Sequence, residues 1–302
     1  MISKDRHTYD LNELIDDFVR RHDIVKTQMV QRESLSIYWT VRTKLEVDAE
    51  LGIRGDELTK TESLWALLLS MLDRTFEYLE GSIVAYVTGS TGASEVISRT
   101  VVESAVNLAY ILVDEEGGNR LTRYFSQYFE TELEEIERWL KLSEDMTGEA
   151  KSVHRSSALN KRVAINWLRE HIDAALSQIG LPTTEQTSSK WPTVAKRFEA
   201  LGLEVAYRTT YAALCSQTHS DAEDLLNYFV FKSIGNQDLL NKAALETVNF
   251  SRLMLYFAVQ YYLIAAGCYS MRFGLADSLA SIVSGREAIH KIQEEIALQL
   301  RE

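Results

Sequence analysis

The stretch LMLYFAVQYYLIAAGC, residues 253–268, is apolar at almost every position. It is shorter than the roughly 20 residues with which a helix crosses a bilayer, and it contains Gln260 and three tyrosines. A helix that is apolar on all sides is typically the buried centre of a soluble bundle. We therefore expect a long buried helix over residues 239–272, with other helices packed around it.

Apolar residues recur at spacings of three and four through most of the chain, which is the pattern of amphipathic helices. A polar connection is expected at Gly52–Lys60, where the capping box Thr59-x-x-Glu62 opens the next helix. No stretch alternates long enough to build a sheet, so the sequence predicts an all-α bundle of about ten helices. The remaining expected helices are Asp10–Met29, Glu33–Leu51, a helix ending near Val87, Ser94–Val113, Asn119–Asp145, Asn160–Ile179, a short helix after Pro192, Val205–Gln217, Asp221–Ile234 and a C-terminal helix.

Composition sets the broad class of protein. Apolar residues make up 46% and charged residues 25% of the 302 positions, which excludes a disordered chain, and two prolines mean few helix breakers. We expect one domain overall, with residues 1–60 as a helical segment packed on a bundle core at 61–302. Two cysteines exclude a disulfide framework.

Charge and the residues at the start of the chain bear on partners and location. The formal net charge of −12 disfavours nonspecific binding of nucleic acid, although a local basic patch would escape that objection. The start, Met1–His7, is charged and lacks the apolar stretch of a signal peptide, so we expect a cytoplasmic protein without membrane contact. The six histidines are scattered and do not give two Glu-x-x-His motifs on facing helices, and we expect no metal and no cofactor.

The C-terminal helix carries a heptad seam. Apolar positions alternate in steps of four and three, interrupted by Arg286 and Gln293. The seam packs either on the chain's own bundle or on a second copy, giving a homodimer. The seam positions are Leu275, Leu279, Ile282, Arg286, Ile289, Gln293, Ile296 and Leu300.

A polar stripe marks the helix ISRTVVESAVNLAYIL, residues 97–112. At about 100° per residue, Arg99, Glu103, Asn107 and Tyr110 fall within roughly 80° of arc, and every other direction is apolar. Because such a helix is buried, the stripe faces protein, and its charges need partners. Arg99 and Glu103, spaced four apart, form either a structural ion pair or part of a site.

A second cluster follows in YRTTYAALCSQTHSDAEDL, residues 207–225. Arg208, Cys215 and His219 share a face of a continuous helix, flanked by Tyr211 and Ser216. The capping box that starts at Ser220 places His219 at a helix junction, where its charge can switch near neutral pH. The structural alternative is a hydrogen-bonded histidine with no chemical role.

Together these residues resemble a bacterial all-helical family known as a domain of unknown function. The resemblance covers about 64–231 and rests on Arg99-Thr100-x-x-Glu103, Arg123-Tyr124, Trp191 and the element from Tyr207 through Ser216 to His219. It implies that the Arg-x-x-x-Glu helix and the Ser-x-x-His element belong to one site, and it implies no activity. A looser similarity is to helical ribonucleases of toxin and phage-defence systems, which carry Arg-x4-6-His, whereas Arg208 and His219 lie eleven apart.

Two functions follow from these residues. The first is a ligand-binding or protein-interaction module, whose internal cluster recognises a small polar or anionic ligand through Asn107, Tyr110, Arg208, Tyr211 and Ser216. The alternative is a metal-independent phosphodiesterase or ribonuclease, with Arg99 or Arg208 stabilising phosphate charge and His219 as general acid or base supported by Glu103. The sequence leaves open whether any reaction is catalysed, which ligand binds, the oligomeric state and the pathway.

Overall fold

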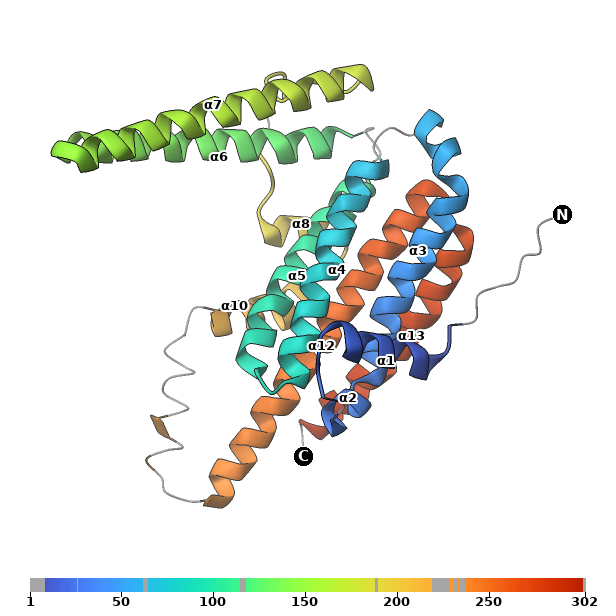
Figure 1. Cartoon of the computed structure of the whole chain (residues 1–302). Helices are drawn as coiled ribbons and strands as arrows, with labels where there is room; N and C mark the ends of the chain where they lie inside the picture. Colours follow the sequence, from blue (N-terminus) through green and yellow to red (C-terminus); the bar gives the residue numbers. More distant parts are fainter. Residues whose placement is uncertain are drawn as a thin grey trace. The chain divides into compact units, whose positions relative to one another are not determined.

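The computed structural model describes residues 9–25, 27–61, 65–114, 118–187, 190–218, 229–230, 233 and 237–300 (Figure 1). Its regular elements within these ranges are helices, which confirms the all-α prediction. The chain divides into two compact units: unit 1 comprises residues 1–112 and 194–302, and unit 2 comprises residues 113–193. The expected boundary at residue 60 stays a prediction.

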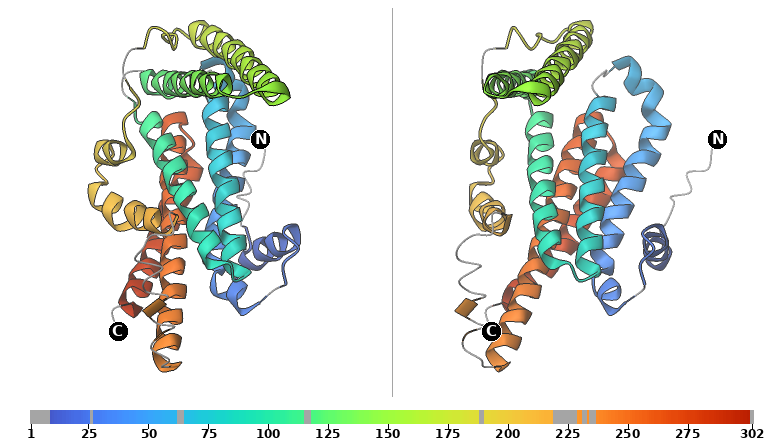
Figure 2. Two further views of the ribbon diagram at one scale, coloured as in Figure 1. Left: turned by 90° about the vertical axis from the view of Figure 1, so that its left-hand side faces the viewer. Right: turned by 60° about the vertical axis from the view of Figure 1, so that its left-hand side comes forward.

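The helix α12 (Gln237–Phe273) lies at the centre of unit 1. It contacts α3 (Ser34–Thr61), α4 (Trp65–Val87), α5 (Thr91–Leu112) and α13 (Ala276–Gln299), which run beside it (Figures 1 and 2). The long helix expected over 239–272 is confirmed; it is largely buried from Asn249 onward, whereas the described side chains of residues 241–247 are exposed. Among the described residues, one helix is long and apolar enough to cross a membrane, and it is α12. However, 72% of its most apolar stretch is buried inside the protein. The cytoplasmic location stays a prediction.

The first expected helix, Asp10–Met29, is wrong as a continuous element. Helix α1 (Leu11–Arg21) begins where the Asp10 carboxylate accepts hydrogen bonds from the backbone N–H groups of Asn12 and Glu13. It ends because the chain turns at Asp23, which has a positive φ of 50°. A short second helix, α2 (Gln28–Arg32), then leads into α3.

Two helices are longer than expected. Helix α3 runs to Thr61, so the connection at Gly52–Lys60 and a helix start at Thr59 are wrong; Glu62 lies outside the described residues. Leu51 and Leu58, seven apart, are both buried, and this packing outweighs the cost of about 1 kcal/mol for a glycine inside a helix. Helix α7 likewise begins at Gly148 rather than Asn160.

Unit 2 is a hairpin of two long helices, α6 (Asn119–Glu144) and α7 (Gly148–Gln178), that lie side by side (Figure 1). Its core explains the early start of α7, because Ala158 is fully buried against α6 and His154 accepts a hydrogen bond of 3.3 Å from the Trp139 indole. The core contains Phe125, Phe129, Leu133, Ile136, Trp139, Leu140, Ala158, Ile165 and Ile172.

The heptad seam of α13 faces the chain's own bundle. Ile282, Ile289 and Ile296 are buried where α13 contacts α12 and α3, while Arg286 is exposed. Gly285 on the same face allows close approach, since a Cβ there would lie 2.6 Å from the Trp39 ring. A homodimer through this helix stays a prediction.

The segment after unit 2 departs most from the expected helices. The short helix expected after Pro192 is α8 (Val194–Ala200), which confirms that prediction. In place of one regular helix over Val205–Gln217, the chain forms α9 (Glu204–Ala206), a π-helical turn η1 (Tyr207–Tyr211) and α10 (Ala212–Thr218). The glycine at position 202, with a φ of 69°, separates α8 from α9. The expected helix Asp221–Ile234 falls largely outside the described residues.

Candidate functional site

The polar stripe of α5 faces the segment from α8 to α10. Most apolar residues of α5 from Val101 onward are buried, and the helix contacts α4 and α12, whereas Arg99, Glu103 and Asn107 are only partly covered. Figure 2 shows α8 and the segment leading to α10 alongside α5. The expectation that the stripe faces protein holds, although its charged groups are not sealed from water.

Tyr211 joins the two charged residues of the stripe. Its hydroxyl donates a hydrogen bond of 2.8 Å to Glu103 Oε2 and accepts a long one of 3.5 Å from Arg99. The Arg99 guanidinium lies 5.6 Å from the centre of the Tyr211 ring, within cation–π range. Arg99 and Glu103 are therefore linked through Tyr211 rather than as a direct ion pair.

Arg197 of α8 completes this polar cluster of Arg99, Glu103, Arg197 and Tyr211. Its guanidinium lies 3.7 Å from Glu103 Oε1, and only 4% of its side chain is exposed, against 36% for Glu103. Sequence reasoning missed Arg197. A signal was present, because Val194, Arg197, Phe198 and Leu201 share the spacing of one helix face, which puts a charge on an otherwise apolar side.

An aromatic group fixes the elements that carry the cluster. The ring of Phe198, fully buried, lies 5.5 Å from that of Tyr207, 5.8 Å from that of Tyr211 and 5.7 Å from that of Tyr261 on α12. Tyr207 and Tyr211 stack on each other with an interplanar angle of 24°. These contacts hold α8 and the π-helical turn against the central helix.

The π-helical turn sets the direction of Tyr211. The Ala212 N–H bonds to the carbonyl of Tyr207, five residues back rather than four. The extra residue in the turn rotates the side chains that follow relative to those that precede it. Such turns are rare in proteins overall, and those that occur are frequently found at functional sites. Here the turn points the Tyr211 hydroxyl at Glu103.

The electrostatics of the polar cluster favour a net positive charge. Burial, reinforced by the hydrogen bond to Glu103, raises the pKa of Tyr211, so its hydroxyl stays protonated and donates. The hydrogen bond with Tyr211 raises the pKa of Arg99 further above its ordinary value. Two guanidinium groups thus face one carboxylate, and the buried Nε of Arg99 has no hydrogen-bond partner among the described residues.

Of the other predicted site residues, some lie next to the polar cluster, one lies outside it, and some are not described by the structure. Asn107 and Tyr110 continue the stripe along α5, and the Asn107 Oδ1 is buried without a partner in the described chain. Arg208 is exposed and stacks on Tyr207 at 5.7 Å, outside the polar cluster. His219 and the Ser216 side chain lie outside what the structure describes, so the predicted meeting of His219 with Arg99 stays a prediction.

A second charged group in unit 1 surrounds the buried carboxylate of Glu33. Glu33 is fully buried and accepts a hydrogen bond of 2.7 Å from Arg252, with Arg32 at 3.7 Å. Burial raises the pKa of Glu33, and the two arginines oppose that shift. The buried pair of Glu33 and Arg252 has the geometry of a structural ion pair that joins the α2–α3 junction to α12.

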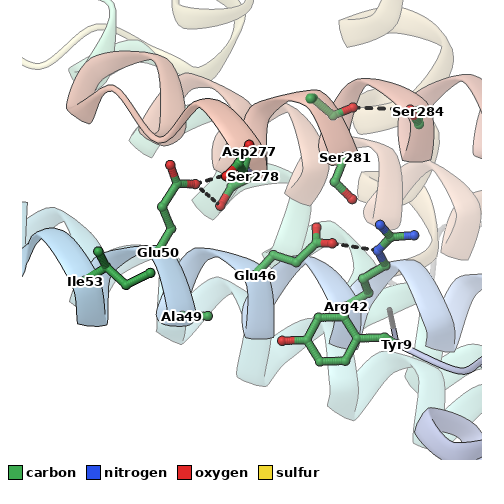
Figure 3. Close-up of a pocket in the computed structure, with 11 residues that line it drawn as sticks. Tyr9, Arg42, Glu46, Ala49, Glu50, Ile53, Asp277, Ser278, Ser281 and Ser284 are labelled. Carbon is green, nitrogen blue, oxygen red and sulfur yellow. Dashed lines mark hydrogen bonds and ion pairs between the residues drawn. The ribbon is translucent and has the colours of Figure 1, made fainter. Parts of the chain in front are cut away.

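A groove of about 500 Å³ runs between α3 and α13 (Figure 3). Its charges are largely paired: Arg42 Nε donates to Glu46 at 2.8 Å, and Glu50 accepts from the backbone N–H and hydroxyl of Ser278. No member of the polar cluster lines it. The polar cluster, with its incompletely bonded arginine, is therefore the stronger candidate site.

Comparison with known proteins gives a family without a function. The chain matches the family model described as a family of unknown function (DUF5677) over residues 66–237. That range includes all four members of the polar cluster. No curated protein and no solved structure matches the chain.

Proposed function

We propose that this chain, which belongs to the family of unknown function DUF5677, is a ligand-binding module whose polar cluster recognises a small anion. The observation that carries the proposal is the state of Arg99. An arginine offers five N–H donors, and Arg99 uses one of them in a long contact with Tyr211. The partly exposed guanidinium is thus fixed in place, and most of its donors have no partner among the residues that the structure describes.

Glu103 does not oppose an anion at this position. Its carboxylate is occupied by the Tyr211 hydroxyl and by the Arg197 guanidinium, and that pairing offsets its charge. Arg99 then supplies the excess positive charge, and its planar donor fork suits carboxylate and phosphate groups. The locally positive cluster makes anion binding compatible with an acidic chain.

The test is thermal unfolding in inorganic phosphate, with sodium chloride at the same ionic strength as reference. A ligand present at about 100 times its Kd stabilises the folded state by about 2.7 kcal/mol, which is a readily measured rise in Tm. We expect this rise for the natural chain and its loss in Arg99→Gln.

Arg208→Gln is the matched control, because Arg208 belongs to the same segment but is exposed and outside the polar cluster. It should keep the phosphate response. An identical response of all three chains would show that phosphate acts elsewhere or only as a salt, and the proposal would be wrong.

Phosphodiester cleavage stays the alternative prediction. It requires His219, which lies outside the residues that the structure describes. Incubation of the natural chain and of His219→Ala with RNA tests it independently of binding. Cleavage that disappears in a folded His219→Ala chain would favour the enzyme over the binding module.

A further inference from the structure

Helix α7 of unit 2 carries an unusual outward face. Ile165 packs toward α6, and Val163 and Trp167, two residues to either side of it, point to the opposite side of the helix at 100° per residue. Both are strongly exposed, Val163 at 69% and Trp167 at 59%. The outward strip, all of it exposed and uncharged, consists of Val153, Ser156, Asn160, Val163, Trp167 and Ala174.

The tryptophan of the outward strip is held in one orientation. The ring of His171, one turn further on, packs against it at a tilt of 37° with centroids 3.9 Å apart, and His171 Nδ1 is 2.7 Å from the Trp167 carbonyl. Exposed tryptophans fixed in this way are typical anchors of protein interfaces, and depletion of charge is typical of the interface centre. The outward strip therefore has the composition of a contact surface.

Two charged residues flank the outward strip on one edge. Arg155 lies eight residues before Val163 and Glu170 lies seven residues after it; both are exposed and neither has an ion-pair partner in the described chain. By contrast, Lys161 and Arg162 pair with glutamates of α6. Both charges lie on the same side of Val163 and at nearly equal distances from it along the helix, so an antiparallel second copy would bring opposite charges to the same level.

We propose that the outward strip of α7 binds the same strip of a second copy of the chain, antiparallel and with Val163 at the two-fold axis. A two-fold contact requires one patch to match itself, which Arg155 and Glu170 satisfy by meeting their opposites across the axis. This contact uses only unit 2 and is independent of the proposed anion site.

The expected contact is modest in size. About 22 residues of helix span roughly 33 Å, and two such faces bury on the order of 1,000 Å², near the lower limit for specific interfaces. The dimer should therefore be reversible, with a Kd on the order of micromolar. Its association must be measured over a range of protein concentrations.

Sedimentation velocity of the full chain between about 1 and 100 µM tests the proposal. We expect a concentration-dependent dimer, and a Kd raised at least about tenfold by Trp167→Ala. Leu142→Ala is the control, because Leu142 is exposed to 63% on α6, away from the outward strip, and it should leave the Kd unchanged.

Charge reversal tests the register. Arg155→Glu and Glu170→Arg should each weaken the dimer by bringing like charges together, and the double variant should restore it. A chain that stays monomeric at the highest concentration would overturn the proposal. A dimer whose Kd is unchanged by Trp167→Ala would also overturn it, since another surface such as α13 would then form the dimer. The same holds if the double variant dimerises no more tightly than the single variants.

Discussion

Replacing Tyr211 with phenylalanine isolates the bond that links the two halves of the polar cluster. The variant keeps the ring that packs on Phe198 and lies under Arg99, and it removes the hydroxyl 2.8 Å from Glu103. A hydrogen bond to a charged group contributes about 1.5–3 kcal/mol. Water can reach Glu103, which is 36% exposed, and replace part of the bond. We therefore expect a loss of about 1.5 kcal/mol of unfolding free energy.

Urea unfolding followed by far-ultraviolet circular dichroism measures this loss. The slope of the unfolding free energy against urea concentration should be the same in the variant and the natural chain. Tyr207→Phe is the matched control, since Tyr207 lies in the same turn and packs on the same rings. In a double-mutant cycle, Tyr211→Phe and Glu103→Ala should be coupled by about 1 kcal/mol. Equal losses for the two tyrosine variants, or no coupling, would refute the role given to this hydroxyl.

Two further predictions concern the bundle. Gly285→Ala should lower the free energy of unfolding by about 1–3 kcal/mol, because its Cβ would lie 2.6 Å from the Trp39 ring. Gly52→Ala, with open space around the new Cβ, should raise it by about 0.5–1 kcal/mol. Chemical denaturation of the two variants measures both changes. Burial raises the pKa of Tyr86 from 10.0 to about 12, so the stability that its neutral form contributes is complete below about pH 10 and is lost as pH rises toward 12. Between about pH 9 and 11 the natural chain should lose about 1.4 kcal/mol more than Tyr86→Phe, and parallel losses would contradict this.

The sequence was sufficient for the fold class because helix periodicity is a local property. The apolar run at 253–268 identified the central helix, and the heptad spacing of Ile282, Ile289 and Ile296 identified the inward face of α13. Helix ends were less predictable. Gly52 was interpreted as the end of a helix, but burial of Leu58 beyond it continues α3, and that burial depends on tertiary contacts that a local pattern does not contain.

The polar cluster was predictable on α5 and less so on its partner segment. Arg99 and Glu103 stood out because polar residues interrupt an apolar helix. Tyr211 was predicted as a flanking residue of a regular helix, whereas the π-helical turn changes its direction and brings it to the centre. The register of such a turn depends on packing against Phe198, which itself packs on Tyr261, so sequence periodicity alone places the residues after it on the wrong face.

The order of elements along the chain explains why Arg197 was missed. The chain leaves unit 1 after Leu112, at the end of α5, and returns to it at Val194, at the start of α8. Arg99 and Arg197 are therefore separated by all of unit 2 in sequence, although both belong to unit 1 and both act on Tyr211 or Glu103. A site divided in this way depends on how α8 and the π-helical turn pack on α5 and α12. The aromatic group around Phe198 supplies that packing, so the recognition proposed for Arg99 depends on a hydrophobic contact that carries no charge itself.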